Sequence, residues 1–303
     1  MHLAGLDLNL IIVLHALFVE KSVSRAAKRV HLSQSATSAA LGRLRDFFGD
    51  ELLVPVGRRM VLTPLAQELV EPVRELVFRA DSIVKHNSRF EASRETRCFR
   101  LMMADYAVSV LMPSILAQAQ HLAPGVTFDI VPFTSQNPFE QLEAGDVDFL
   151  VLPKQRANPA HPYDELFSDD YVWIVWTGNK DVKEQITTNQ FLSMGHVAVR
   201  FPSHRDPVLE EWFSEQFGER RKVEVTTVTF DLMTRLIPGT NRVATLMKRM
   251  AVQYAEWLPI RLITPSSRIP SLMLTIQWHK FNSSDPGTNW VRALFAKACE
   301  TLV

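Results

Sequence analysis

Residues 23–48 read VSRAAKRVHLSQSATSAALGRLRDFF, a pattern of two short helices joined by a turn. His31 and Leu32 interrupt the helical pattern, and Ser33 is placed to cap the helix that follows. Ala26 and Ala27 are small enough to let the two helices approach closely. This arrangement predicts a helix-turn-helix, in which the start of the second helix enters the major groove of DNA.

The flanking segments extend this motif to a winged module over residues 1–63. Apolar residues recur at helical spacing from Leu6 to Phe18, which predicts a preceding helix. The first helix of the motif then follows a capping serine, Ser22 or Ser24. Residues 52–62 predict two short strands around a basic turn, which is the pattern of a wing.

The side chains predicted to contact DNA are polar or basic and lie at helix starts, on the outer face of the recognition helix, or on the wing. Glutamine bonds adenine through two hydrogen bonds, serine and threonine bond base edges or phosphates, and arginine bonds phosphates or enters the minor groove. The inner face is assigned to Ala36, Ala40, Leu41 and Leu44. The predicted DNA contacts are Ser24, Arg25, Ser33, Gln34, Ser35, Thr37, Ser38, Arg43, Arg45, Arg58 and Arg59.

The charge distribution agrees with this interpretation. The whole chain has 33 basic and 33 acidic residues, but the segment from Lys21 to Arg59 has 8 basic and 3 acidic residues. A local basic excess is the electrostatic footprint of a nucleic-acid contact. The alternative is a three-helix packing module with a solvated basic face.

A long linker helix is predicted over residues 64–87. Thr63 is placed to cap it, and Pro64 suits its first position. Its apolar residues approach the spacing of a coiled-coil seam, which predicts a dimer that presents two reading heads to DNA; burial against its own module is the alternative. The seam consists of Leu65, Leu69, Val73, Leu76, Ala80 and Ile83. The polar residues 88–97 predict a hinge.

The composition is that of a soluble globular chain, with 47% hydrophobic and 22% charged residues among 303. There is no apolar run of about 18 residues, so no transmembrane helix is expected. The N-terminus does not have the pattern of a signal peptide, and the two cysteines, Cys98 and Cys299, suit free thiols in a reducing compartment. We therefore expect a cytoplasmic protein without a membrane partner.

Residues 98–303 predict a two-lobed α/β domain, because short apolar strands alternate with helices. We expect lobe I at about 98–168 and 272–303, and lobe II at about 169–271, each with a largely parallel sheet. A cleft between such lobes is where ligands usually bind. The predicted strands are 98–104, 126–133, 147–152, 196–200, 223–228, 243–246 and 272–278.

The candidate effector-binding residues follow the strand ends that face this cleft. Free N–H groups at helix starts suit a carboxylate, nitro or phenolate oxygen, and phenylalanines suit an aromatic ring. Asp105 has the alternative role of capping its own helix, and the phenylalanines that of core packing. The candidates are Asp105, Tyr106, Ser109, Phe133, Thr134, Ser135, Leu152, Arg200, Phe201, Ser203, His204, Phe230, Thr245 and Phe281.

No catalytic motif is found for a nucleophile elbow, a dinucleotide fold, a phosphate loop or a zinc protease. His204 lies near Arg200 and Asp206 in the sequence, but a surface or ligand-orienting role is favoured there. We therefore expect neither an enzyme, nor a metal site, nor a cofactor.

Several motifs resemble those of the LysR-type transcriptional regulators, and the resemblance covers essentially the whole chain. The N-terminal matches are Asp7-Leu8-Asn9-Leu10, Ser24-Arg25-Ala26-Ala27, Leu32-Ser33-Gln34-Ser35-Ala36-Thr37-Ser38 and Thr63-Pro64. Ser35 stands where the family usually has proline, and serine is tolerated in a first helical turn. The C-terminal matches, to the nodulation protein D branch, are 239–245 (GTNRVAT), 277–280 (QWHK), 285–287 (DPG) and 290–292 (WVR).

This resemblance implies an effector domain like a periplasmic binding protein, with a small co-inducer between its lobes. The branch includes regulators that answer to salicylate and to nitro- or chloroaromatic compounds, so an aromatic or phenolic effector is expected. The resemblance also implies a regulator that binds double-stranded promoter DNA at a T-N11-A dyad, as a tetramer of linker-helix dimers, with RNA polymerase as a further candidate partner. An activator is expected, and a repressor, or a regulator that does both, is the alternative. The competing hypothesis is a solute-binding or sensing module whose helical N-terminus serves only oligomerisation.

Overall fold

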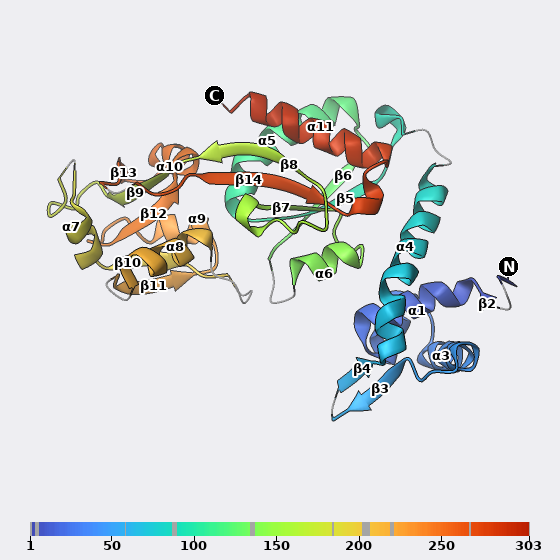
Figure 1. Cartoon of the computed structure of the whole chain (residues 1–303). Coiled ribbons are helices and arrows are strands. Elements are labelled where there is room, and N and C mark those ends of the chain that lie inside the picture. Colours follow the sequence, from blue (N-terminus) through green and yellow to red (C-terminus); the bar gives the residue numbers. More distant parts are fainter. Residues whose placement is uncertain are drawn as a thin grey trace. The chain divides into compact units, whose positions relative to one another are not determined.

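The computed structural model describes residues 2–3, 6–57, 59–86, 90–133, 137–183, 185–201, 207–218, 221–266 and 268–302. The chain divides into two units, Met1–Arg89 and Phe90–Val303 (Figure 1). Among the described residues, no helix is both long and apolar enough to cross a membrane.

The first unit is a winged helix-turn-helix followed by a long helix. Ser22, not Ser24, caps the first helix of the motif by accepting the Arg25 N–H at 3.4 Å, and Ser33 caps the second by accepting the Ala36 N–H at 3.1 Å. The elements are β1 (His2–Leu3), β2 (Leu6–Asp7), α1 (Asn9–Glu20), α2 (Val23–Arg29), α3 (Gln34–Phe48), β3 (Leu53–Val56), β4 (Arg59–Leu62) and α4 (Pro64–His86).

The first predicted helix begins later than expected. Leu6 and Asp7 pair with the preceding β1 as an antiparallel strand, and the Asp7 carboxylate accepts the Asn9 N–H at 3.0 Å. The helix therefore starts at Asn9, with Leu8 as its N-cap, because Leu6 and Asp7 are already bonded in a strand.

Asp50 ties the wing to the start of α4. One of its carboxylate oxygens accepts both the Leu52 N–H and the Thr63 hydroxyl, each at 2.6 Å. The Thr63 oxygen in turn accepts the Ala66 N–H at 3.1 Å, which is the predicted cap of α4. Gly57 turns the wing with a φ of 61°, in the left-handed region that favours glycine.

Of the seam residues of α4 whose side chains the structure describes, Leu69 and Val73 pack in the core of their own module. Val73 is buried in the core that α1 and α3 build around Leu14 and Leu44, and Leu69 packs at its edge. Leu76, one turn further along, is 44% exposed. Some of the described seam residues thus pack within the module, and others are exposed to solvent.

Lobe I of the second unit is a five-stranded sheet in the order β6-β5-β7-β14-β8. Figure 1 shows α5 and α11 side by side on one face of this sheet and α6 on the other. Its elements are η1 (Ala92–Arg94), β5 (Cys98–Met103), α5 (Asp105–Leu122), β6 (Thr127–Val131), α6 (Pro138–Glu143), β7 (Phe149–Pro153), η2 (Lys154–Arg156), β8 (Tyr163–Asp169), β14 (Leu272–Trp278), η4 (Lys280–Asn282) and α11 (Pro286–Glu300).

Lobe II is a second five-stranded sheet, in the order β11-β10-β12-β9-β13. Its core includes Trp173, whose ring stacks on Phe191 with 4.0 Å between centroids. Its elements are β9 (Tyr171–Trp176), α7 (Thr188–Ser193), β10 (His196–Val199), α8 (Val208–Phe217), β11 (Val223–Thr227), α9 (Phe230–Arg235), β12 (Val243–Met247), α10 (Lys248–Ala255) and β13 (Ile260–Ile263).

The predicted two-lobed α/β fold is confirmed, but the largely parallel sheets are not. In lobe I, β5 runs parallel to β6 and β7, whereas β14 is antiparallel to β7 and β8. Lobe II repeats this, because β9 is antiparallel to both β12 and β13. The antiparallel strands are those that carry the chain between the lobes, across Asp170 and again across 264–271.

Residues 90–97, most of the predicted hinge, pack against lobe I. The Phe90 ring lies 5.5 Å from that of Trp290, and Arg97 forms an ion pair with Asp285 at 2.7 Å. Asp285 also caps α11 by accepting the Thr288 N–H at 2.8 Å. Residues 87–89 lie outside the described part of the chain.

Candidate functional site

The start of α3 presents a row of exposed polar side chains. Gln34, Ser35 and Ser38 are exposed, and Arg43 follows on the same helix, also exposed. The Ser33 hydroxyl, besides capping the helix, lies 3.0 Å from the Ser35 hydroxyl. This end of α3 can therefore offer amide and hydroxyl groups to the edges of bases.

Thr37 does not belong to that row, and its prediction as a DNA contact is wrong. Its side chain is fully buried, and its hydroxyl donates to the Ser33 carbonyl at 3.1 Å. Ala36, which was assigned to the inner face, is exposed instead. With Ser33 as cap, the buried face runs through Thr37, Ala40 and Leu44, at the spacing of one helical face.

Arg45, a predicted phosphate contact, is bonded to the wing. Its guanidinium donates to the Glu51 carbonyl at 2.8 Å and to the Leu53 carbonyl at 2.9 Å, and it pairs with the Glu51 carboxylate at 2.9 Å. These bonds engage Nε and Nη2 of the guanidinium. Arg45 thus fixes the position of β3 against the recognition helix.

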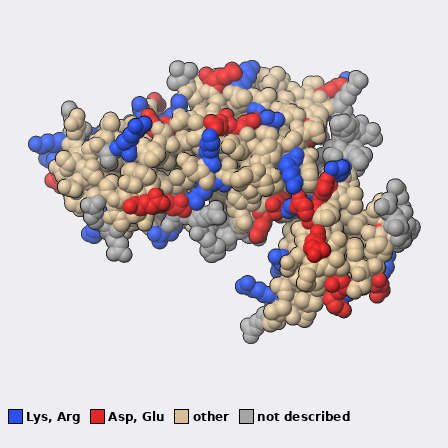
Figure 2. Space-filling model, viewed as in Figure 1, with Lys and Arg blue, Asp and Glu red and all other residues tan. Residues whose placement is uncertain are grey.

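The remaining predicted DNA contacts differ in their exposure and in their bonds to the rest of the protein. Ser24 and Arg59 are exposed, and Arg25 is exposed but bonds Glu20 at the end of α1. Arg58 lies outside the described residues. Figure 2 shows basic side chains beside β3 and β4 on the visible face of this unit.

In the second unit, a cavity of about 340 Å³ lies between the two lobes. Its size falls in the usual range for small-molecule sites, and most of its wall is apolar. The residues that line it are Ala104, Tyr106, Ala107, Phe133, Asn137, Pro138, Phe139, Val151, Leu152, Pro153, Arg156, Leu272 and Leu274 from lobe I, and Tyr171, Phe201, Pro207, Val208, Leu209, Phe230 and Met247 from lobe II.

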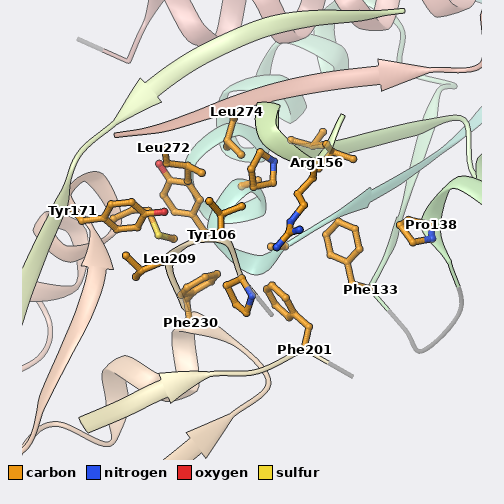
Figure 3. A pocket seen from close by; sticks show the side chains of 18 of the residues that line it. Tyr106, Phe133, Pro138, Arg156, Tyr171, Phe201, Leu209, Phe230, Leu272 and Leu274 are labelled. Carbon is orange, nitrogen blue, oxygen red and sulfur yellow. The ribbon is translucent and has the colours of Figure 1, made fainter. Parts of the chain in front are cut away.

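Three phenylalanines meet across this cavity. The Phe133 ring of lobe I lies 6.0 Å from the Phe201 ring of lobe II, and Phe201 lies 6.1 Å from Phe230 in an edge-to-face arrangement. Figure 3 shows Phe201 and Phe230 at the bottom of the view, Phe133 at the right, and Tyr106 and Tyr171 at the left. The wall thus offers edges and faces of aromatic rings to a bound ring.

The structure brings together five of the predicted effector-binding residues. Tyr106, Phe133, Leu152, Phe201 and Phe230 all line the cavity. Thr134, Ser135, Ser203 and His204 lie outside the described residues. The other five predicted residues do not line it, for reasons that differ.

Arg200, Thr245 and Phe281 lie elsewhere. Arg200 is exposed and bonds the next strand through its backbone N–H, and Thr245 is buried inside the lobe II sheet opposite Trp173. Phe281 follows the far end of β14, whereas the cavity is lined by the beginning of that strand, at Leu272. Strand ends of a lobe lie at both of its edges, and only one edge faces the cleft.

Asp105 and Ser109 do not line the cavity, and their side chains form hydrogen bonds within the protein. Ala104, not Asp105, is the N-cap of α5, so the capping prediction is wrong as well. The Asp105 carboxylate accepts the Asp231 N–H at 2.8 Å, across the lobes, while the Ser109 hydroxyl donates to the Tyr106 carbonyl at 2.9 Å. Burial raises the pKa of Asp105 above its ordinary value.

A second contact between the lobes involves Tyr106, which lines the cavity. The Tyr106 hydroxyl donates to Asp169 at 2.5 Å, and the same carboxylate oxygen accepts the Arg249 N–H of lobe II at 3.2 Å. Burial raises the pKa of Asp169, and burial together with this carboxylate raises the pKa of Tyr106. The phenol therefore stays protonated and serves as a hydrogen-bond donor.

Sequence reasoning missed Arg156, Phe139 and Tyr171 in the cavity wall. Phe139 lies in α6, and Arg156 lies four residues beyond Leu152, the last residue of the predicted strand 147–152. Tyr171 opens β9, whose apolar run YVWIVW at 171–176 is the signal in the sequence for this buried strand.

Comparison with protein families gives two matches that together span nearly the whole chain. The family described as "LysR substrate binding domain" matches residues 92–300, and "Bacterial regulatory helix-turn-helix protein, lysR family" matches residues 8–67. The chain belongs to the LysR family of transcriptional regulators.

Relatives and solved structures of LysR regulators match this chain over nearly its whole length. Nodulation protein D 2 of Rhizobium leguminosarum bv. phaseoli is 36% identical over 303 residues, covering 100% of this chain and 95% of that protein. A "probable transcriptional regulator" from Pseudomonas aeruginosa is 26% identical, with a TM-score of 0.66 and 97% of each chain covered. Full-length CbnR complexed with its target DNA shares the fold at 14% identity, with a TM-score of 0.54, 97% of this chain and 100% of that one.

Proposed function

We propose that this LysR regulator recognises promoter DNA through the exposed start of α3 and the wing. The observation that carries this is the row Gln34, Ser35 and Ser38, exposed on a helix whose opposite face is buried in the winged module. Arg43 and Arg59 add exposed positive charge for phosphates. Arg45 and Thr37 act indirectly, by holding the wing and the helix in place.

The regulator acts as a dimer through the second half of α4 and as a tetramer through its effector domains. Support for the dimer comes from Leu76, an apolar residue of the seam that its own chain leaves 44% exposed. Two winged modules on one dimer match a dyad-symmetric site.

The effector is a small aromatic or phenolic molecule that binds between the lobes. The cavity between them is lined by Phe133, Phe201 and Phe230 and has about 340 Å³ of space. A ligand in it acts only through its different affinity for two arrangements of the regulator. A coupling of about 1–3 kcal/mol is comparable to the cost of bending DNA, so such a ligand is sufficient to change the bend.

The test is capture of sheared DNA from the source genome at roughly physiological salt, followed by sequencing. The expected result is enrichment of a few intergenic fragments that contain the dyad. Gln34→Ala abolishes this enrichment, whereas the control Gln67→Ala, on the exposed face of α4, keeps it. Uniform recovery of all fragments by the wild type would leave a charge-driven association and the competing hypothesis of a sensing module.

A further inference from the structure

Arg156 has a distinct position in the effector cavity. It is the one residue with a full charge among the described residues that line the cavity. It ends η2, directly after β7, and Figure 3 shows its guanidinium directed toward Phe201, beside the ring of Phe133. A cation thus stands next to the aromatic cluster.

Arg156 also bridges the lobes. It forms an ion pair with Glu211, which lies on α8 of lobe II. The Arg156 side chain is 22% exposed and that of Glu211 is 44% exposed. The guanidinium is therefore held largely inside the protein, while its partner keeps about half of its contact with solvent.

A second cavity of about 280 Å³ adjoins the first one on the side of this ion pair. The two cavities share Arg156, Tyr171, Val208, Leu209 and Leu272 as wall residues. Glu211 lines only the second cavity. The ion pair consequently stands at the boundary between them, with the cation on the side of the aromatic rings.

We propose that Arg156 recognises an anionic oxygen group on the aromatic effector and exchanges Glu211 for it. This inference rests on the proposed aromatic effector and specifies its charge. An apolar cavity excludes an anion unless a cation pairs with it, and the planar guanidinium binds a carboxylate through two hydrogen bonds. Glu211 is released at small cost, because an ion pair with a half-exposed partner contributes little and the carboxylate returns to water.

The exchange changes what joins the lobes. In the structure, the Arg156–Glu211 pair links η2 to α8. With the anion on Arg156 and the ring against Phe201 and Phe230, the ligand itself links lobe I to lobe II. The charge of the effector thus decides whether the ion pair or the ligand holds this side of the cleft.

Calorimetric titration of the full-length protein with matched probes tests the inference. The probes are benzoate, naphthoate and biphenylcarboxylate, each beside its neutral carboxamide, which has the same shape. The variants are Arg156→Gln, Glu211→Gln and the control Glu165→Gln, whose residue pairs with Lys154 of the same segment at 2.5 Å without lining the cavity. Circular dichroism checks that each variant is folded.

The wild type is expected to bind at least one carboxylate about tenfold more tightly than its amide, as a charge-assisted hydrogen bond provides. Arg156→Gln removes this preference while it keeps binding to the amide. Glu211→Gln strengthens binding of the carboxylate severalfold and leaves the amide unchanged, and Glu165→Gln behaves as the wild type.

Amides that bind the wild type as tightly as the acids would overturn the inference and leave the aromatic effector in place. So would an acid preference that survives in Arg156→Gln. If no probe of either series binds, the inference fails together with the aromatic effector, while DNA capture still decides the DNA-binding part of the proposed function.

Discussion

The Asp105 carboxylate of lobe I accepts the backbone N–H of Asp231 in lobe II at 2.8 Å. The bond joins the first residue of α5 to the first turn of α9, and the Asp231 carboxylate there accepts a hydrogen bond from Tyr254 at 2.5 Å and pairs with Arg235 at 3.0 Å. Burial raises the pKa of Asp105, so its charged form is disfavoured in the folded state even though it is bonded. This combination makes its substitution informative.

Asp105→Asn is expected to be at least as stable as the wild type at pH 7, whereas Asp105→Ala loses about 1–2 kcal/mol. The Asn oxygen still accepts the Asp231 N–H without a buried charge, and Ala leaves that N–H unbonded. Burial raises the pKa of Asp105 in the folded protein. The charged carboxylate therefore lowers the free energy of unfolding by its full amount above that pKa, and by nothing below the unfolded pKa of about 3.9. Denaturant unfolding from pH 7 to 4 should show the advantage of Asn shrinking; an advantage that grows instead would contradict this sign.

His196 is expected to make lobe II sensitive to acid. Its fully buried ring bonds the Phe191 carbonyl through Nε2 at 2.9 Å and accepts the Arg221 Nε–H on Nδ1 at 3.1 Å. Burial, with Arg221 beside it, lowers the pKa of His196 to about 3. Its contribution to stability is thus complete above the unfolded pKa of about 6.5 and is lost as the pH falls toward the folded value.

The measurement is the slope of unfolding free energy against pH between 6.5 and 4. His196 contributes at most about 1.4 kcal/mol per pH unit, and His196→Asn removes that part of the slope. His121→Asn, at an exposed position on α5, is the matched control and keeps the wild-type slope. Equal slopes for the wild type and His196→Asn would refute the assignment.

Thr37→Val is expected to lower the stability of the winged module by about 1 kcal/mol and to leave operator affinity unchanged. Valine keeps the shape of the buried side chain and loses only the bond to the Ser33 carbonyl. Gln34→Ala gives the reverse, with no loss of stability and loss of operator binding. Thermal unfolding and operator titration of both variants measure these two effects. A Thr37→Val variant of unchanged stability that binds the operator less tightly would show that Thr37 contacts DNA.

Arg43→Gln and Arg45→Gln should differ in the salt dependence of DNA binding. Arg43 is exposed, so its removal lowers the slope of log Kd against log salt by about one, the contribution of one phosphate contact. Arg45 is bonded to the wing, so its removal weakens binding and stability while the slope stays constant. A lower slope in Arg45→Gln would show that it reaches a phosphate.

The sequence predicted the winged module well because its signals are local. Capping serines, a basic turn and Thr63-Pro64 each depend on a few neighbouring residues, and all but the choice between Ser22 and Ser24 were decided by the sequence. Polarity places Thr37 on the outer face of α3, whereas the helical phase set by the Ser33 cap places it on the buried face. A threonine can be buried where its hydroxyl bonds a carbonyl one turn earlier, as it does here at Ser33.

The cavity was predicted less completely because it depends on long-range packing. Phe133, Phe201 and Phe230 were found from strand ends, but which edge of each lobe faces the cleft is fixed by crossovers that the sequence pattern did not reveal. Arg156 and Tyr171 lie beside those crossovers, in η2 and at the start of β9. Their roles follow from contacts between residues far apart in the chain.

The order of strands has a consequence for synthesis of the protein. Lobe II is one continuous segment, so its sheet can close while the ribosome is still translating the rest. Lobe I must wait, because β14 inserts between β7 and β8, more than a hundred residues after they were made. Until then the edges of β7 and β8 are unpaired and open to wrong partners, so a chain that is cut before β14 should aggregate rather than accumulate as a folded fragment.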